Sequence, residues 1–289
     1  MYKSKRYSYT YEDWDTDGKD ANTMIEEILN DPELPSLEEI VIGCWGECWD
    51  SDESPQPIID GIIENREAFS HIKSLFVGDM DYEDCEVSWI TQGDYSRLWA
   101  AMPQLEKLSV KGSSELELGE IRHDNLQSLE IICGGLPVNI IKKVQNAKLP
   151  SLRSLILYIG IEDYGFDGDI STIQELLAKS DFPSLTYLGI TDSEIQDEIV
   201  ETVLASKYID QIFSLDLSMG TLTDKGGQML LDEVPKHPNI VLLNLEYHYL
   251  SDKMMKKLGD LENVEVNVDE PQEVDEYDGE IYYYPMLTE

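Results

Sequence analysis

Basic residues are scarce in this chain. Its 289 residues include 21 Lys and Arg against 59 Asp and Glu, which gives a formal net charge of −38. An electric field of that sign repels phosphate backbones, so the composition argues against nucleic-acid binding. The same field attracts a basic protein, polyamines or divalent cations. Solubility alone is an equally good reason for it, because an acidic surface keeps an extended fold monomeric.

Long apolar runs and cysteines are also few. No stretch approaches 18 apolar residues, so no segment is predicted to span a membrane. The first 18 residues have no apolar core of the kind that a signal peptide needs. Without a secretory signal, the four cysteines are expected to be reduced thiols. They are Cys44, Cys48, Cys85 and Cys133. These absences predict a cytoplasmic protein.

Catalytic motifs are missing as well. The sequence contains no G-x-S-x-G, no phosphate-binding glycine loop, no H-E-x-x-H and no dinucleotide fingerprint. Its four histidines are scattered along the chain at positions 71, 123, 237 and 248. We therefore expect a protein that is not an enzyme and that needs no cofactor.

What the sequence does contain is nine copies of one apolar frame, L-x-x-L-x-L. From Ile40 in the first copy to Val264 in the last is 224 residues over eight steps, a mean period of 28. That frame and period are typical of a leucine-rich repeat, in which each unit gives one short strand and one connecting segment. The copies are Leu37/Ile40/Ile42, Ile72/Leu75/Val77, Leu105/Leu108/Val110, Leu126/Leu129/Ile131, Leu152/Leu155/Leu157, Leu185/Leu188/Ile190, Ile212/Leu215/Leu217, Ile240/Leu243/Leu245 and Leu261/Val264/Val266.

Several connecting segments have apolar residues at helical spacing. These are Met24/Ile25/Ile28/Leu29, Ile59/Ile62/Ile63, Ile170/Ile173/Leu176/Leu177, Ile199/Val203/Leu204 and Met254/Met255/Leu258. Strand and helix in alternation predict an α/β solenoid, a right-handed horseshoe with about nine parallel strands on its concave face and helices on its convex face. Two steps, Leu108 to Leu129 and Leu243 to Val264, span only 21 residues and leave little room for a helix.

The ends differ from the repeats. We expect one leucine-rich repeat domain over residues 1–289, with an N-terminal cap at 1–33, repeats at 34–268 and an acidic, tyrosine-rich cap or tail at 269–289. The alternating run Tyr7/Tyr9/Tyr11 predicts an edge strand over the first repeat.

Residues 207–250 resemble the ribonuclease-inhibitor-like class of leucine-rich repeats. Leu215-Asp-Leu217-Ser-Met-Gly-Thr-Leu222-Thr-Asp224-Lys-Gly226 reads as its L-x-L-x-x-N-x-L-x-D-x-G unit, and Leu243 to Asp252 repeats the pattern. The whole chain, through stretches such as GDMDYEDCEVSWITQGDY at 78–95 and GIEDYGFDGD at 160–169, resembles a bacterial family of short cytoplasmic leucine-rich repeat proteins without an established activity. The resemblance implies the fold, and it implies that Asp224 and Asp252 accept the first amide hydrogens of a helix.

The chain departs from that class at the repeat's asparagine position. The residues there are Trp45, Met80, Ser113, Gly134, Gly160, Ser193, Gly220 and His248. The backbone groups that an asparagine ladder satisfies must therefore find other partners. We expect His248 to bond to the backbone in place of an asparagine, and not to act as a general base.

Two surfaces are candidates for binding. Residues between the frame positions point to the concave face, because strand side chains alternate. The concave candidates are Phe76, Glu130, Tyr187, Asp216 and Asn244. Long acidic and aromatic loops follow several strands and are expected to gather on one edge, the rim. The rim candidates are Trp45, Trp49, Tyr82, Trp89, Tyr95, Tyr164, Phe166, Tyr247, His248 and Tyr249.

Aromatic rings among carboxylates suit cationic side chains, through cation–π contacts and ion pairs. The alternative for each aromatic is local packing that seals the core. On balance, the sequence predicts a protein-recognition module that binds a basic protein partner through the concave face and the rim.

Metal signals are weak. Asp13, Asp15 and Asp17 followed by Gly18 match the start of a calcium loop, but its twelfth position is Met24 and not glutamate. Asp163, Asp167 and Asp169 form a similar cluster, and Cys44 with Cys48 lacks a second pair at zinc spacing. A calcium-binding structural or sensing module is therefore the alternative function.

Overall fold

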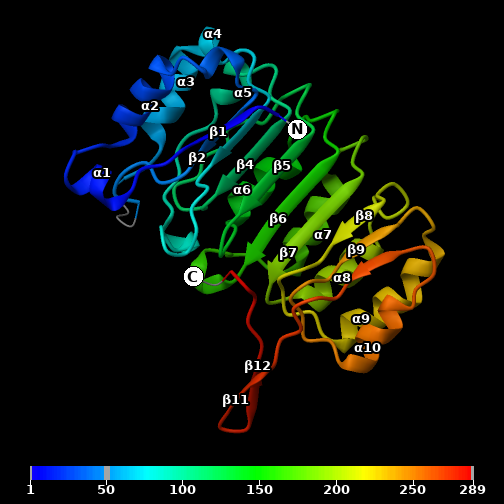
Figure 1. Cartoon of the computed structure of the whole chain (residues 1–289). Coiled ribbons are helices and arrows are strands. Elements are labelled where there is room, and N and C mark those ends of the chain that lie inside the picture. Colours follow the sequence, from blue (N-terminus) through cyan, green and yellow to red (C-terminus); the bar gives the residue numbers. More distant parts are fainter. Residues whose placement is uncertain (1, 49–52, 288–289) are drawn as a thin grey trace.

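The computed structural model describes residues 2–48 and 53–287. A single sheet of ten strands, β1 to β10 in sequence order, runs through the molecule, and all neighbouring strands are parallel. Helices cover one face of this sheet, and the sheet curves so that its other face is concave (Figure 1). The molecule is therefore an α/β leucine-rich repeat solenoid, as the sequence predicts.

The ten strands are short and evenly placed. They are β1 (Ser4–Tyr7), β2 (Glu39–Ile42), β3 (Ser74–Val77), β4 (Lys107–Lys111), β5 (Ser128–Ile132), β6 (Ser154–Gly160), β7 (Tyr187–Ser193), β8 (Ser214–Asp216), β9 (Leu242–Asn244) and β10 (Glu265–Asn267). The nine copies of the frame correspond to β2 to β10, and the additional strand is β1, which pairs with β2 at the edge of the sheet. It ends at Tyr7, so the run of alternating tyrosines is only partly a strand, and Tyr11 already begins a helix.

The helices connect successive strands. They are α1 (Tyr11–Asp15), α2 (Ala21–Asn30), α3 (Gln56–Glu64), α4 (Arg66–Phe69), α5 (Leu98–Ala101), α6 (Val138–Gln145), α7 (Ile170–Lys179), α8 (Gln196–Leu204), α9 (Asp224–Glu233) and α10 (Asp252–Gly259). Short 3-10 turns include η2 (Val87–Trp89) and η3 (Glu162–Tyr164). The five apolar patterns at helical spacing are confirmed as α2, α3, α7, α8 and α10.

The frame residues form the core. Leu75, Leu108 and Leu129 are partners in the strand register and are almost fully buried between the sheet and the helices. Each strand alone would leave this apolar edge in water, and the shared core is what stabilises the stack.

The predicted position of the ninth copy of the frame is wrong by two residues. In the structure Val266, and not Val264, lies opposite Leu243. The last step is therefore longer than the sequence predicted, and it has room for α10. The other short step is confirmed, because no helix lies between β4 and β5.

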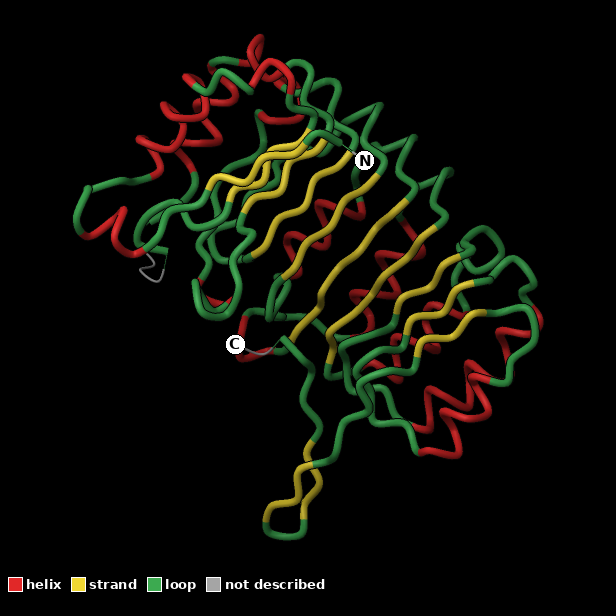
Figure 2. The backbone as a smooth tube through the Cα atoms, viewed as in Figure 1, coloured by secondary structure: helices red, strands yellow, loops and turns green. Residues whose placement is uncertain are grey.

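The chain leaves the sheet after β10. Strands β11 (Asp275–Tyr277) and β12 (Glu280–Tyr282) form an antiparallel hairpin. Figure 2 shows this hairpin standing away from the solenoid and the following residues returning to the edge of the sheet. We call residues 283–287 the docked segment. Among the described residues, no helix is long and apolar enough to cross a membrane.

Candidate functional site

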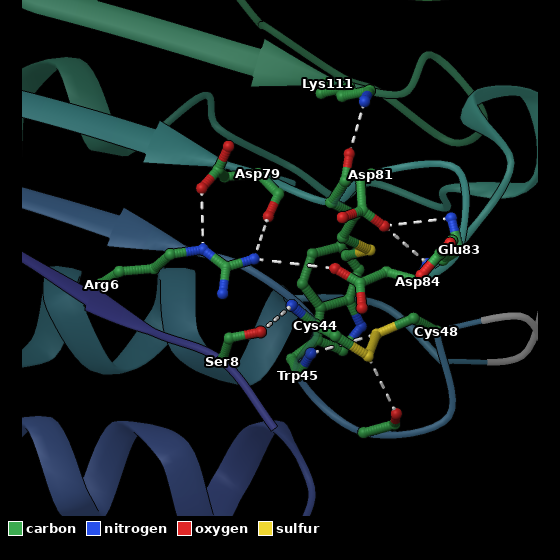
Figure 3. A network of polar contacts seen from close by, with 12 residues as sticks. Arg6, Ser8, Cys44, Trp45, Cys48, Asp79, Asp81, Glu83, Asp84 and Lys111 are labelled. Atoms are coloured by element: carbon green, nitrogen blue, oxygen red, sulfur yellow. Dashed lines mark hydrogen bonds and ion pairs between the residues drawn. A yellow bond between two sulfur atoms is a disulfide. The ribbon is translucent and has the colours of Figure 1, made fainter. Parts of the chain in front are cut away.

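The loops that follow β2 and β3 are tied together by polar contacts. Arg6 of β1 donates from Nε to Asp79 Oδ2 at 2.8 Å (Figure 3). A terminal nitrogen of the same guanidinium, Nη2, lies 3.7 Å from Asp84 Oδ2. Ser8 Oγ accepts a hydrogen bond from the amide of Cys44. The acidic loop at residues 79–84 is therefore held by the N-terminal strand.

Cys44 and Cys48 form a disulfide, so the expectation of four reduced thiols is wrong for this pair (Figure 3). The tight turn after β2 brings their Cα atoms to 5.8 Å, within the range that a disulfide bridges. The two sulfurs are consequently not zinc ligands. Cys85 and Cys133 are free and buried, and burial raises their pKa values to about 11 and about 12. Both stay protonated at neutral pH.

The rim aromatics divide into packing residues and surface residues. The fully or almost fully buried ones are Trp45, Tyr95, Phe166 and His248. The remaining described ones reach the surface: Tyr82 is 68% exposed and Trp89 57%, and the partly buried ones are Tyr164, Tyr247 and Tyr249. Trp49 lies outside the described residues. Local packing is therefore the role of four of these side chains, and Tyr249 bonds to Tyr284 of the docked segment. Tyr82 and Trp89 have the most surface open to a partner.

One pocket on the rim combines two of the surface aromatics. It has a volume of about 550 Å³ and is formed by the loops after four successive strands, β3 to β6. Its lining is Ser88, Trp89, Thr91, Ser113, Ser114, Pro137, Asp163, Tyr164 and Gly165. None of these nine residues is basic. The pocket thus offers aromatic and proline walls, several hydroxyl groups and one carboxylate.

A larger hollow of about 740 Å³ lies on the helical side, between α7 and α8. Its charged lining is mixed, since Glu198 and Glu201 share it with Lys207 and Lys225. It has no aromatic side chain and lies away from the loops. We regard the rim pocket as the better site because its lining is aromatic and of one charge.

Close backbone packing shapes this pocket. Gly160 has φ +70, and a Cβ atom there would lie 1.7 Å from the carbonyl oxygen of Gly134. Only glycine fits at such a crossing. The contact folds the loop that carries Asp163 and Tyr164 over the turn after β5, beside Pro137.

Three of the five concave candidates meet in a largely buried polar network. Tyr187 donates to Asp216 Oδ2 at 2.6 Å, and Asn244 Nδ2 donates to Asp216 Oδ1 at 3.1 Å. Glu130, two strands away, accepts from Ser109 at 2.8 Å. Phe76 lies on β3 and is partly buried; the other four span β5 to β9.

A residue that the sequence reasoning missed stands in the middle of this network. Burial raises the pKa of Tyr158 well above its ordinary value, and so do the charges of four carboxylates around it. These belong to Glu130, Asp216, Asp192 and Glu246. Its place on the concave face could have been predicted, because Tyr158 comes directly after the buried frame residue Leu157 and strand side chains alternate. Glu130, Asp216 and Glu246 therefore make the concave face near β6 to β9 negative, whereas the buried Asp192 is largely protonated at neutral pH.

Asp192 is the second residue that was missed. It is fully buried, and desolvation raises its pKa to about 8. Its Oδ1 accepts a hydrogen bond of 2.8 Å from the amide of Leu287. No local pattern indicates this burial, because the covering residue is 95 positions away in the sequence.

Three of the calcium candidates, Asp13, Asp167 and Asp169, have other partners. Asp13 lies inside α1, where its carboxylate accepts from the amide and hydroxyl of Thr10 and pairs with Lys19 at 2.9 Å. Asp167 accepts from the amide of Val138 at the start of α6, and Asp169 caps α7. Asp15 and Asp17 lie at the end of α1 and in the turn after it. Within residues 2–48 and 53–287, no three His, Cys, Asp or Glu side chains gather as metal ligands.

His248 bonds to the backbone as predicted. Its Nε2 lies 3.0 Å from the carbonyl oxygen of Val268, and its Nδ1 accepts from the amide of Leu250 at 3.0 Å. Burial lowers its pKa. A neutral ring with the proton on Nε2 satisfies both partners, so His248 replaces an asparagine as a structural link between repeats.

The expectation that Asp224 and Asp252 cap the helices is wrong. Thr223 and Ser251 are the N-caps of α9 and α10, while Asp224 and Asp252 are the first helical residues. Asp224 instead accepts from the amide and hydroxyl of Ser251, both at 2.8 Å. It therefore joins one repeat to the cap of the next.

This fold and this rim define a leucine-rich repeat protein with an acidic, aromatic edge. Among solved structures, the chain is similar to a Bacteroides fragilis protein whose crystal structure was determined by the Northeast Structural Genomics Consortium. The match has a TM-score of 0.87 and 42% sequence identity, and covers 94% of this chain and 75% of that chain. The chain belongs to the family of this Bacteroides fragilis protein.

A weaker match is the TLR13 chain of a TLR13–ssRNA13 complex. It has a TM-score of 0.41 and 14% identity, over 86% of this chain and 36% of that one. A likeness of this size supports no conclusion about the present chain. No protein-family model matches the sequence, and no curated protein matches it.

Proposed function

We propose that this protein is a non-enzymatic recognition module that binds a basic protein through its rim and concave face. The leucine-rich repeat fold is typical of protein-interaction modules. The observation that carries the proposal is the rim pocket, in which exposed Trp89 and partly buried Tyr164 stand beside Asp163 without a basic lining residue. Such a pocket suits the stem and charged head of an arginine or lysine side chain.

Binding proceeds in two stages. The net charge of −38 first attracts a basic surface over a distance set by the ionic strength. An arginine or lysine of the partner then enters the rim pocket, while the carboxylates around Tyr158 face further positive charge across the concave surface. The charge thus increases the association rate, and the aromatic contact determines which residue is bound.

Affinity capture with matched variants tests this proposal. The immobilised full chain, the double variant Trp89→Ala/Tyr164→Ala and the control Tyr277→Ala are each exposed to an extract at low salt. Tyr277 is 72% exposed on the hairpin, so its loss removes an exposed aromatic away from the rim. We expect one basic protein in stoichiometric amount on the wild type and the control, eluted by salt, and its loss from the double variant. The same proteins on all three columns would contradict the proposal.

The calcium-binding alternative has no comparable support. Asp13 is already paired with Lys19, and a calcium loop would need that carboxylate free. A rise in melting temperature with calcium, abolished by EDTA and by Asp15→Ala with Asp17→Ala, would restore it.

A further inference from the structure

The docked segment crosses the edge of the sheet at several consecutive repeats. The hydroxyl of Tyr249 donates to the carbonyl oxygen of Tyr284 at 2.9 Å and accepts from the amide of Tyr284 at 3.0 Å. The amide of Met286 donates to the carbonyl oxygen of Met219 at 2.8 Å. Further along, the Leu287 amide donates to Asp192.

The groups that the edge recognises are almost all main-chain groups. Tyr284, Met286 and Leu287 bond through their backbone, and the ring of Tyr283 adds an edge contact with Tyr249, at 4.9 Å between centroids. Recognition of this kind depends on an extended backbone more than on particular side chains, as in other modes of peptide recognition.

The receiving positions on the solenoid are equivalent in successive repeats. Asp192 and Met219 each lie two residues beyond the last frame residue of their repeat, and both have positive φ, 55 and 65. Left-handed backbone is unfavourable for methionine, and such positions are concentrated at ligand clamps. Here they turn the Asp192 carboxylate and the Met219 carbonyl toward the docked segment.

The docked segment leaves one polar atom of this edge without a hydrogen bond. Asp192 Oδ2 is buried and accepts no hydrogen bond from the described residues. Pro285 of the segment is buried, whereas Tyr283, Tyr284 and Met286 stay between 40% and 51% exposed. A segment that brought a polar partner to Asp192 Oδ2 would therefore bind more tightly than this one does.

From these contacts we propose that the edge at Asp192, Met219 and Tyr249 is a binding site for an extended peptide, and that residues 283–287 occupy it in cis. An incoming peptide must displace the docked segment. The hairpin β11–β12 acts as the tether, and a tethered segment competes at an effective concentration in the millimolar range. This site adjoins the pocket at Trp89, because the carbonyl oxygen of Leu287 lies beside Gly134 and Tyr164, but none of its three contact residues lines that pocket.

Release of the docked segment is the first step of the test. Leu287→Pro removes the amide that donates to Asp192 and changes no residue of the solenoid. Hydrogen–deuterium exchange of the full chain should show the Met286 amide protected in the wild type and exchanging at least tenfold faster in Leu287→Pro. Continued protection of Met286 in the variant would contradict the proposal.

Binding in trans is the second step. The probe is a fluorescein-labelled peptide of residues 280–287, followed by fluorescence anisotropy. We expect Leu287→Pro to bind it at least tenfold more tightly than the wild type, because the site is empty in the variant. Adding Tyr249→Phe should weaken peptide binding about tenfold, through loss of two hydrogen bonds. The control Tyr282→Phe, whose hydroxyl contacts only the hairpin residue Glu280, should have no effect.

The proposal would be overturned if the wild type and Leu287→Pro bound the peptide with equal affinity. It would also be overturned if Tyr249→Phe and the control Tyr282→Phe had equal effects on that affinity. Trp89→Ala should leave peptide binding unchanged. Failure of the basic-partner proposal and failure of this one therefore give different results.

Discussion

The Tyr187 hydroxyl donates a hydrogen bond of 2.6 Å to Asp216 Oδ2, one strand away on the concave face. Burial and the Asp216 charge together raise the pKa of Tyr187 well above its ordinary value. Asp216 also accepts from Ser218 at 2.6 Å and from Asn244. The two residues thus fix a negatively charged network on the surface that we assign to partner binding.

Tyr187→Phe should destabilise the protein by about 1–2 kcal/mol, because the hydrogen bond to a charged, almost buried carboxylate is lost. Urea denaturation measures the free energy of unfolding. The control is Tyr282→Phe, whose hydroxyl contact is exposed on the hairpin and should change stability by less than about 0.5 kcal/mol. Equal effects of the two substitutions would contradict a stabilising role for the Tyr187–Asp216 contact.

His248→Asn should be tolerated, whereas His248→Ala should cost about 2 kcal/mol, since the Ala variant leaves the Val268 carbonyl and the Leu250 amide without partners. The lowered pKa of His248 also has a consequence for pH. The unfolded chain takes up a proton below about pH 6.5, before the folded chain does, so stability falls as the pH drops through that value.

His248→Asn should reduce this loss on acidification, measured as the melting temperature between pH 7.5 and 5. The control is His237→Asn, because His237 is near the surface and pairs with Asp210. An unchanged pH profile in His248→Asn would show that the ring is not held neutral.

Asp192 predicts the opposite pH dependence. Its pKa of about 8 in the folded protein is far above the value of an exposed aspartate. Its contribution to stability is therefore complete below about pH 4 and is lost as the pH rises to 8, by up to about 5 kcal/mol. Asp192→Asn keeps a residue that tolerates the left-handed backbone and should stabilise the protein at pH 8 but not at pH 4. Thermal unfolding at both pH values decides this, and a variant that is less stable at pH 8 would contradict the assignment.

Gly160→Ala should destabilise the rim severely, by more than about 3 kcal/mol, because the new Cβ would overlap the Gly134 carbonyl. The matched control is Gly259→Ala at the end of α10, where a Cβ meets nothing within 4 Å. That change should lie within about 1 kcal/mol of the wild type. Similar stability of the two variants by urea denaturation would contradict the tight crossing that shapes the pocket.

The repeating architecture was predictable because apolar spacing records burial in a strand or on one helix face. Leu108 and Leu129 fall in register because each repeat gives the same residue to the same layer of the core. The ninth copy shows where this fails: Val264 and Val266 both fit the frame, and only the pairing with β9 chooses Val266.

The site was harder to predict. Trp45 and Trp89 follow similar strands in similar acidic loops, yet Trp45 is buried and Trp89 exposed. The difference depends on how loops from different repeats pack, which residue types alone do not record. The burial of Asp192 could not be predicted for the same reason, since the docked segment that covers it is distant in the sequence.

The central claim is that the rim pocket at Trp89 binds a positively charged side chain. Its most direct test is a titration of the full chain with N-acetyl-arginine methylamide, with N-acetyl-citrulline methylamide as the neutral control of similar shape. NMR of the tryptophan indole N–H groups reports binding at Trp89. We predict saturable binding of the arginine compound with a dissociation constant of about 1–10 mM, weakened by salt and abolished by Trp89→Ala. Equal responses to both compounds, or an arginine response that survives Trp89→Ala, would contradict the account.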